Sequence, residues 1–226
     1  MLRDLAYLFY PKHCAACDNY LDRNEDVLCT SCRYHLPQGN FHLINAKNIE
    51  KVFYDSVKIE NFISLLIFEK EGLVQNLIHN LKYRGQKKIG AILGAWLASK
   101  MLSTEQFNDL DVVIPVPLHK KRLKERGYNQ VEEFGKKIAQ SLHITYEDAV
   151  LIKKSYTVKQ SKQKRIMRWQ NSTASFSIQN ETRLTGKHIL LVDDIITTGA
   201  TLQACIDELK NIEGIKLSIA TMAITE

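Results

Sequence analysis

The fold of this 226-residue chain is decided by one stretch, His188-Ile-Leu-Leu-Val-Asp-Asp-Ile-Ile-Thr-Thr-Gly-Ala-Thr201. Its apolar first half predicts a buried strand over 187–192, and the residues that follow the stretch predict a helix over 201–211. A strand that leads through two acids and a short turn into a helix is typical of an α/β sheet, where ligands lie at the carboxyl ends of the strands. We therefore expect Asp193 and Asp194 to be exposed at that edge of the sheet.

The turn between these two elements predicts a phosphate site. Its backbone N–H groups can surround an anion that the helix dipole also attracts, and its threonines add hydroxyl donors. Gly199 lets the backbone come close to such a ligand. Two neighbouring acids would repel a phosphate unless they accept hydrogen bonds from sugar hydroxyls or bind Mg²⁺. The whole stretch thus predicts a site for a phosphorylated ribose.

The rest of the chain alternates between strand-like and helix-like segments. This alternation predicts an α/β fold with an open, mostly parallel sheet flanked by helices. The polar, basic segment 153–172 is expected to be a loop, and Cys205 a buried packing residue. We expect strands at 52–59, 64–68, 111–116, 149–152 and 217–224, and helices at 71–83, 89–102 and 128–142.

The other four cysteines form two C-x-x-C pairs, Cys14 with Cys17 and Cys29 with Cys32. Four thiolates on two such turns fit a tetrahedral structural Zn²⁺. Two disulfides or a redox C-x-x-C are the alternatives, but the chain shows no secretion signal, and a redox motif would not come paired. We therefore predict a small zinc ribbon over 1–39 and a main domain over 40–226, and we expect Cys14→Ser to loosen only the ribbon.

Composition and charge argue against a membrane or secreted protein. The chain is 45% hydrophobic and 25% charged, and no apolar run approaches the ~18 residues of a membrane span. Because a secretory signal is missing, we expect the protein in the cytoplasm. The net charge is +6, and about half of the basic residues lie in 82–88, 119–126 and 153–168. Such clusters predict an anionic partner, a phosphorylated metabolite or nucleic acid, although solvated loops and helix faces give the same pattern.

Two sets of motifs resemble known families. The segment ILLVDDIITTGAT at 189–201 resembles the phosphoribosyl pyrophosphate (PRPP) signature of type I phosphoribosyltransferases. The order of the C-x-x-C pairs, LIHNLKYRG at 77–85, PVPLH at 115–119 and R-x-x-x-RGYNQ at 122–130 is similar to the ComF family over almost the whole chain. This resemblance implies a zinc-binding module followed by a type I phosphoribosyltransferase-like domain, and an association with the uptake of single-stranded DNA in natural transformation.

The resemblance also implies roles for individual residues. Asp193 and Asp194 would bind the ribose 2′- and 3′-hydroxyls of PRPP, which comes with Mg²⁺. The 5′-phosphate would be held by Thr197, Thr198, Gly199, Ala200 and Thr201. Pyrophosphate would lie against the turn of Val116, Pro117 and Leu118, with Arg122 and Arg126 beside it, although both arginines also suit an ordinary basic surface. Arg168 belongs to the loop expected to close over PRPP, so the implied catalytic residues are Asp193, Asp194, Arg126 and Arg168.

Two functions of different classes remain open. The first is a Mg²⁺-dependent enzyme that transfers ribose 5-phosphate from PRPP to an acceptor that the sequence does not identify. The second is a protein that binds PRPP or single-stranded DNA without turnover and works with DNA-uptake proteins. The resemblance disfavours purine salvage, because purine-salvage members of the superfamily carry an aspartate base where this chain has Thr197.

Overall fold

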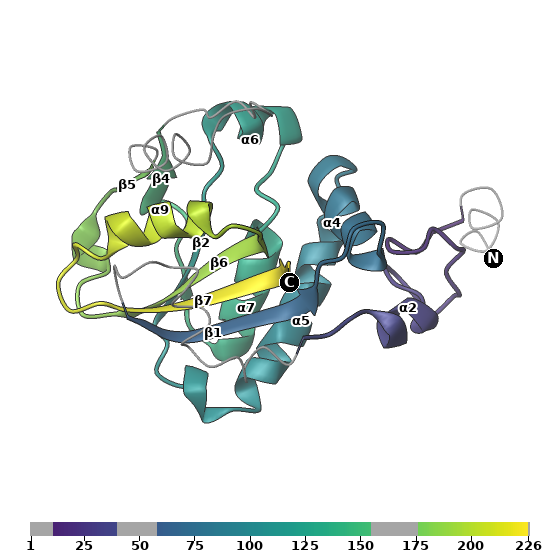
Figure 1. Ribbon diagram of the computed structural model, residues 1–226, viewed down its shortest axis with the longest axis horizontal. Helices are drawn as coiled ribbons and strands as arrows, with labels where there is room; N and C mark the ends of the chain where they lie inside the picture. Colours follow the sequence, from purple (N-terminus) through teal and green to yellow (C-terminus); the bar gives the residue numbers. More distant parts are fainter. Residues whose placement is uncertain (1–10, 40–57, 155–175, 226) are drawn as a thin grey trace.

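A five-stranded parallel sheet lies at the centre of the computed structural model, which describes residues 11–39, 58–154 and 176–225 (Figure 1). The strands lie in the order β1-β7-β6-β2-β3, and each neighbouring pair is parallel. The apolar runs of β6 and β7 suit strands that are covered on both faces. The bounds are β1 Ile59–Ile67, β2 Val112–Pro115, β3 Thr145–Tyr146, β6 His188–Ile196 and β7 Lys216–Ile224.

Helices cover both faces of this sheet (Figure 1). On one face, α4 (Leu73–Tyr83), α5 (Lys88–Leu102) and α7 (Glu132–Leu142) share a buried cluster with Leu190 and Val192 of β6. On the other face, α9 (Ala200–Leu209) shares a second cluster with Ile189 and Leu191. Successive residues of β6 therefore face opposite helix layers, as the two-residue period of a strand requires.

Shorter elements complete the described chain. The helix α6 (Lys120–Arg126) follows β2, and β4 (Leu151–Lys153) pairs antiparallel with β5 (Phe176–Ile178) in a separate small sheet. The remaining elements are the helix α2 (Thr30–His35) and the 3-10 turns η2 (Glu105–Phe107) and η3 (Glu181–Arg183). Within the described ranges, no helix combines the length and apolar character that crossing a membrane requires.

Most of the predicted elements are confirmed, with some differences. β1 is one strand where two are predicted, and residues 52–57 of the first lie outside the described ranges. The strand predicted over 187–192 continues to Ile196, because β7 pairs with it as far as Ile224. The helix predicted from residue 128 begins at Glu132. α2, β3, β5 and α6 are not predicted. The expected loop 153–172 lies almost entirely outside the described residues.

Helices α5 and α7 approach each other closely at Gly94. A Cβ atom added there would lie 2.6 Å from the carbonyl oxygen of Phe134, a distance that real Cβ atoms do not show. At Gly90, an added Cβ would lie 3.3 Å from the nitrogen of Phe134, so the fit there is less tight. The missing side chain at Gly94 therefore sets the distance between the two helices.

The cysteine-bearing segment packs directly onto α4. The side-chain amides of Asn76 and Asn80 each donate a 2.8 Å hydrogen bond, to the carbonyl oxygens of Ala16 and Ala15 respectively. These alanines belong to the same buried cluster as apolar side chains of α4 and α5. Residues 37–39 then hydrogen-bond along the edge of β1. One continuous core therefore reaches from the cysteine segment to the sheet.

Candidate functional site

The two acids of the segment 188–201 lie within β6 and not at an exposed strand end. Asp193 and Asp194 are 8% and 5% exposed, so the expectation that they are exposed is wrong. The cause is β7, which continues beside β6 and places Thr221 opposite Asp193. Asp194 contacts Lys82 of α4, whereas Asp193 lies on the side of Cys205 in α9. The acids therefore direct their carboxyl groups to opposite faces of the sheet.

Asp194 has one satisfied oxygen and one that is not. Its Oδ1 lies 2.8 Å from the Nζ of Lys82, and this ion pair is largely buried. Its backbone N–H donates a 2.8 Å hydrogen bond to Oδ1 of Asp193, which ties the two acids together. Its Oδ2 is buried and has no hydrogen-bond partner among the described residues. A buried carboxylate oxygen without a donor is unfavourable, so this atom suits a ligand that brings a hydroxyl or a cation.

Burial controls the ionisation of Asp193. Burial raises its pKa to about 7, and the neighbouring charge of Asp194 adds to this effect. The N–H of Asp194 and the cations of Lys82 and Lys153 act in the opposite direction. Asp193 therefore changes its charge near neutral pH, as is common for groups in functional sites.

The turn after β6 is open to a ligand. Thr197, Thr198 and Thr201 are exposed, and Gly199 is the N-cap of α9 with a φ of 71° in the left-handed region. No side chain caps the first turn of this helix, so its N–H groups are not taken by a side-chain cap. Ala200 is the first residue of α9. The segment predicted to hold a phosphate therefore presents exposed hydroxyls and a helix start without a side-chain cap, the two features on which that prediction depends.

The turn after β2 lies beside the acid pair. The N–H of Val116 donates to the carbonyl oxygen of Val192, the residue before Asp193. The carbonyl oxygen of Val116 accepts a 3.0 Å bond from the side chain of Asn129. Val116 therefore has no free N–H for pyrophosphate, and Pro117 has none by its chemistry. Of the predicted residues in this turn, Leu118 alone could offer a backbone donor.

A cavity of about 590 Å³ adjoins this turn. Its lining includes Pro117, Leu118, Asn129, Tyr146 and Lys153, from β2 to β4. Burial lowers the pKa of Lys153, and the nearby charge of Arg122 lowers it further. Lys153 therefore lies close enough to Arg122 and to Asp193 for their charges to act on it.

None of the predicted arginines is among the described residues that line this cavity. Arg126 donates a hydrogen bond to the side chain of Gln130, and its guanidinium lies 5.5 Å from the ring of Tyr83 in α4. It therefore lies toward the end of α4. Arg168 lies outside the described residues.

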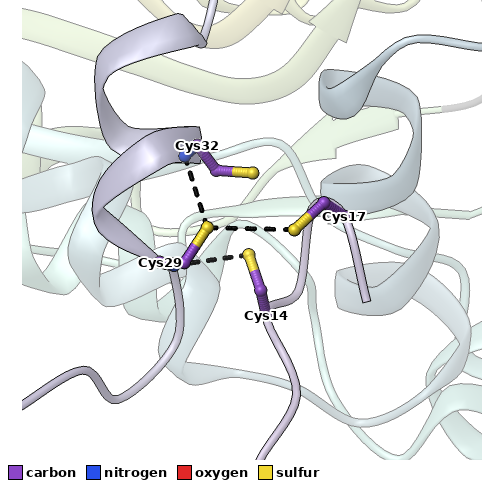
Figure 2. A group of neighbouring side chains, drawn as sticks. All are labelled: Cys14, Cys17, Cys29 and Cys32. Carbon is purple, nitrogen blue, oxygen red and sulfur yellow. Dashed lines mark hydrogen bonds between the residues drawn. The ribbon is translucent and has the colours of Figure 1, made fainter. Parts of the chain in front are cut away.

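The four N-terminal cysteines converge on one point (Figure 2). Their sulfur atoms all lie within 4.8 Å of one another, and the Sγ atoms of Cys17 and Cys29 are 3.8 Å apart. A tetrahedral zinc site with Zn–S bonds of about 2.3 Å requires sulfurs about 3.8 Å apart. The N–H groups of Cys29 and Cys32 each donate 3.3 Å bonds to sulfur, on Cys14 and Cys29. All four thiols are free, which disagrees with the disulfide alternative and fits a metal site.

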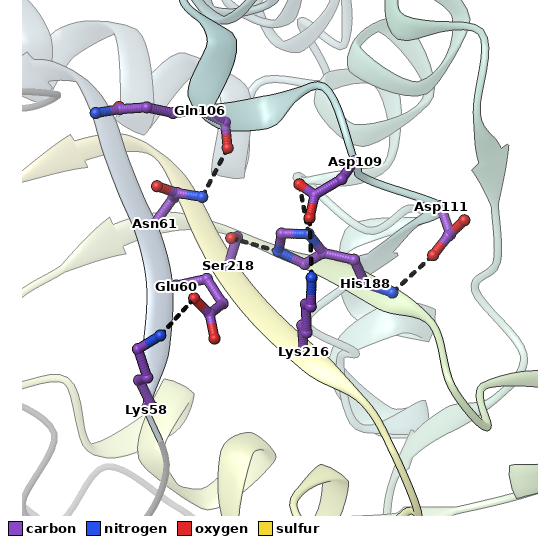
Figure 3. Close-up of polar contacts among 9 residues, drawn as sticks. All are labelled: Lys58, Glu60, Asn61, Gln106, Asp109, Asp111, His188, Lys216 and Ser218. Carbon is purple, nitrogen blue, oxygen red and sulfur yellow. Dashed lines mark hydrogen bonds and ion pairs between the residues drawn. The ribbon is translucent and has the colours of Figure 1, made fainter.

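A second polar cluster, at the opposite ends of the strands, has the order of a catalytic triad (Figure 3). The Nε2 of His188 lies 2.8 Å from Oγ of Ser218, and its Nδ1 lies 2.9 Å from Oδ1 of Asp109. Asp111 accepts a 2.8 Å bond from the N–H of His188. Ser218 is 0% exposed and His188 is 4% exposed. We therefore assign this buried cluster a structural role, in which it fixes the starts of β6 and β7.

Lys82 and Lys153 are the site residues that sequence reasoning missed. Both belong to basic stretches, and Lys82 also lies in the LIHNLKYRG motif, but neither lysine is given a role there. The signal that could have found Lys82 is its place in the LIHNLKYRG motif, directly after the apolar stripe of α4. Lys153 gives no comparable signal, because only the fold brings β4 near β6.

Comparisons with known proteins agree with this geometry. Residues 132–224 match the phosphoribosyl transferase domain family. DNA utilization protein YhgH of Shigella flexneri is 26% identical, covering 84% of this chain and 80% of that protein. Competence protein F of Haemophilus influenzae is 25% identical, with 86% and 89% covered. Competence protein ComFC of Bacillus subtilis is 26% identical, with 81% and 78% covered.

Among solved structures, the chain matches glutamine PRPP amidotransferase of B. subtilis at 19% identity. This match covers 62% of the chain and 30% of that structure, and its TM-score of 0.40 is too low to bear on function. The sequence relatives, the domain match and the sulfur cluster agree with one another. The chain is therefore a homologue of proteins named DNA utilization protein YhgH and competence protein F or ComFC, and in this chain the match to the phosphoribosyl transferase domain follows a four-cysteine cluster.

Proposed function

We propose that the chain binds PRPP together with Mg²⁺ and transfers its ribose 5-phosphate to an acceptor. The observation that carries the proposal is the order of groups along one segment, where two buried carboxyl groups precede exposed threonines and a helix start. The carboxylates would accept hydrogen bonds from the ribose hydroxyls, and residues 197–201 would hold the 5′-phosphate. The domain match over 132–224 supports this assignment.

The chemistry of the acid pair also fits Mg²⁺. Carboxylate oxygens are preferred ligands of this ion. Asp193 would hold the ion, which when bound supplies positive charge near the pyrophosphate. Oδ2 of Asp194, a buried oxygen without a donor among the described residues, is then left for a ribose hydroxyl. Zn²⁺ in the four-thiol cluster would have a structural role only, because all four ligand positions come from the protein.

In the transfer, the bond between ribose C1 and the pyrophosphate oxygen breaks, and the acceptor forms a bond to C1. Pyrophosphate leaves with the electron pair, so negative charge grows on it. Arg122 and Lys153, near the turn of residues 116–118, would stabilise that charge.

Calorimetry with PRPP and Mg²⁺ tests the binding step. Thr198→Glu places a negative charge in the phosphate turn, and we expect it to weaken PRPP binding by roughly tenfold or more. Asn108→Glu, at the exposed residue that follows η2, is the matched control and should leave affinity unchanged. Release of pyrophosphate from labelled PRPP that depends on an added acceptor tests the transfer step. A wild-type protein that binds no PRPP would refute the proposal.

A second candidate function is binding of single-stranded DNA without turnover. It is favoured by α6, in which Lys120, Lys121 and Lys124 are exposed and no residue is buried. The names of the relatives, which refer to competence and DNA utilization, agree with it. We expect affinity for an oligonucleotide to fall steeply with salt, and further in Lys120→Glu/Lys124→Glu. An affinity that ignores both changes would remove this candidate.

A further inference from the structure

Lys82 is a lysine in an unusual place. Its side chain is only 22% exposed, and its Nζ lies 2.8 Å from Oδ1 of Asp194, whose side chain is 7% exposed. Lysine is rarely buried, because removing its charge from water is costly unless it is paired. A buried ion pair is weak support for stability, since apolar residues of similar size often stabilise as well or better. Fold stability alone therefore does not explain this buried ion pair.

Contacts on two sides of α4 fix the position of Lys82. Toward the sheet, α4 buries Val74, Leu77, Ile78 and Leu81, and Lys82 follows directly after this stripe. Toward the cysteine segment, Asn76 and Asn80 anchor the helix to backbone carbonyl groups. Lys82 lies in the last turn of α4, where the helix dipole favours a cation. Its ammonium group therefore reaches Asp194 from a rigid support.

The ion pair orients Asp194. Lys82 occupies Oδ1, while Oδ2 stays buried with no hydrogen-bond partner among the described residues. A ribose hydroxyl could donate the hydrogen bond that this oxygen lacks. We propose that Lys82 is a positioning residue for PRPP: it holds Asp194 through Oδ1 and leaves Oδ2 to accept a hydrogen bond from a ribose hydroxyl. This inference rests on the proposed function, and it adds a residue from α4 to a site otherwise built from β6 and its turn.

Calorimetric titration of the chain with PRPP and Mg²⁺ at pH 7 tests the inference. We expect Lys82→Met to weaken PRPP binding by roughly tenfold or more, because Asp194 loses the contact that orients it. Lys82→Arg keeps the charge and should recover part of the affinity. Lys58→Met removes an exposed lysine paired with Glu60 and should match the wild type.

The outcomes separate this inference from the proposed function. If the wild type binds no PRPP, the proposed function fails and this inference fails with it. If the wild type binds PRPP and Lys82→Met binds it with the same affinity, only this inference is overturned. It is also overturned if Lys82→Arg binds PRPP as weakly as Lys82→Met, since a loss that does not depend on the positive charge points to a purely structural role. Should circular dichroism show that Lys82→Met does not fold, Lys82→Gln is judged by the same criteria.

Discussion

At Asp193, burial opposes the ionisation that sugar binding needs. The pKa of about 7 lies above the 3.8 of an unperturbed aspartate, so the folded chain holds a proton that the unfolded chain releases. The contribution of this residue to the free energy of unfolding therefore falls as pH rises from about 4 to about 7, and then stays constant. Stability and ligand binding make opposite demands on the same carboxyl group.

We expect Asp193→Asn to stabilise the ligand-free protein above pH 7 by roughly 1–3 kcal/mol, and by little near pH 4. Asparagine keeps an oxygen that can accept the N–H of Asp194, and it carries no charge to bury. The same change should weaken PRPP binding. Urea unfolding at several pH values measures the first effect, with Glu105→Gln, an exposed change on η2, as the control. Lower stability of Asp193→Asn at pH 8 would show that the buried charge is fully compensated.

At the scale of elements, the pairing of α5 with α7 supports the sheet beneath the site. Gly94 is the point of closest approach, and β2 lies against α7 through Gly135. A change in the distance between the two helices would therefore be transmitted to the strand that precedes the predicted pyrophosphate turn.

We expect Gly94→Ala to destabilise the fold by about 1–3 kcal/mol, because the added Cβ meets a backbone carbonyl oxygen that cannot move alone. The helix propensity of alanine, about 1 kcal/mol better than glycine, offsets part of this effect. Gly90→Ala is the matched control and should cost less, since its nearest contact is longer. Chemical denaturation of both variants gives the comparison. Equal stability of the two variants would contradict the role assigned to Gly94.

The elements also show what could be predicted from the sequence. The apolar runs of β6, β7 and α4 give correct elements, because burial alone determines their composition. The end of β6 is missed because it is set by pairing with β7, which is not visible in the sequence of β6 itself. The polar side chains of Asp193 and Asp194 suggest that the strand ends there, but they do not prevent the backbone from pairing. The phosphate turn is predictable because it is contiguous, whereas Lys82 and Lys153 come from distant segments and meet the acids only in the folded chain.

At the scale of the whole molecule, the cysteine cluster and the sheet belong to one core. Cys14 and Cys32 lie in the same buried cluster as Leu77 of α4 and Leu93 of α5. We therefore no longer expect Cys14→Ser to loosen only the ribbon: α4 should lose stability as well. Loss of the metal should also remove the surface against which α4 packs.

We expect the purified protein to contain zinc, and Cys14→Ser or a chelator to remove it and lower the Tm of the entire chain. Elemental analysis gives the metal content, and hydrogen exchange shows whether α4 loses protection together with the cysteine segment. Cys205→Ala removes a buried thiol outside the cluster and should leave zinc bound. Wild-type protein without any metal would contradict the zinc assignment. Full protection of α4 after zinc loss would contradict the shared core.

The two asparagines of α4 have a consequence for protein engineering. Asn76 and Asn80 bind main-chain carbonyl groups and not side chains, so these contacts depend on the backbone path of the cysteine segment. Other residues at Ala15 and Ala16 are compatible with the contacts only if that path is kept. A chimera that combines the first part of one homologue with the remainder of another should therefore fold when α4 is transferred together with the cysteine segment. A graft that separates them would leave two amide groups and a leucine-rich helix facing water.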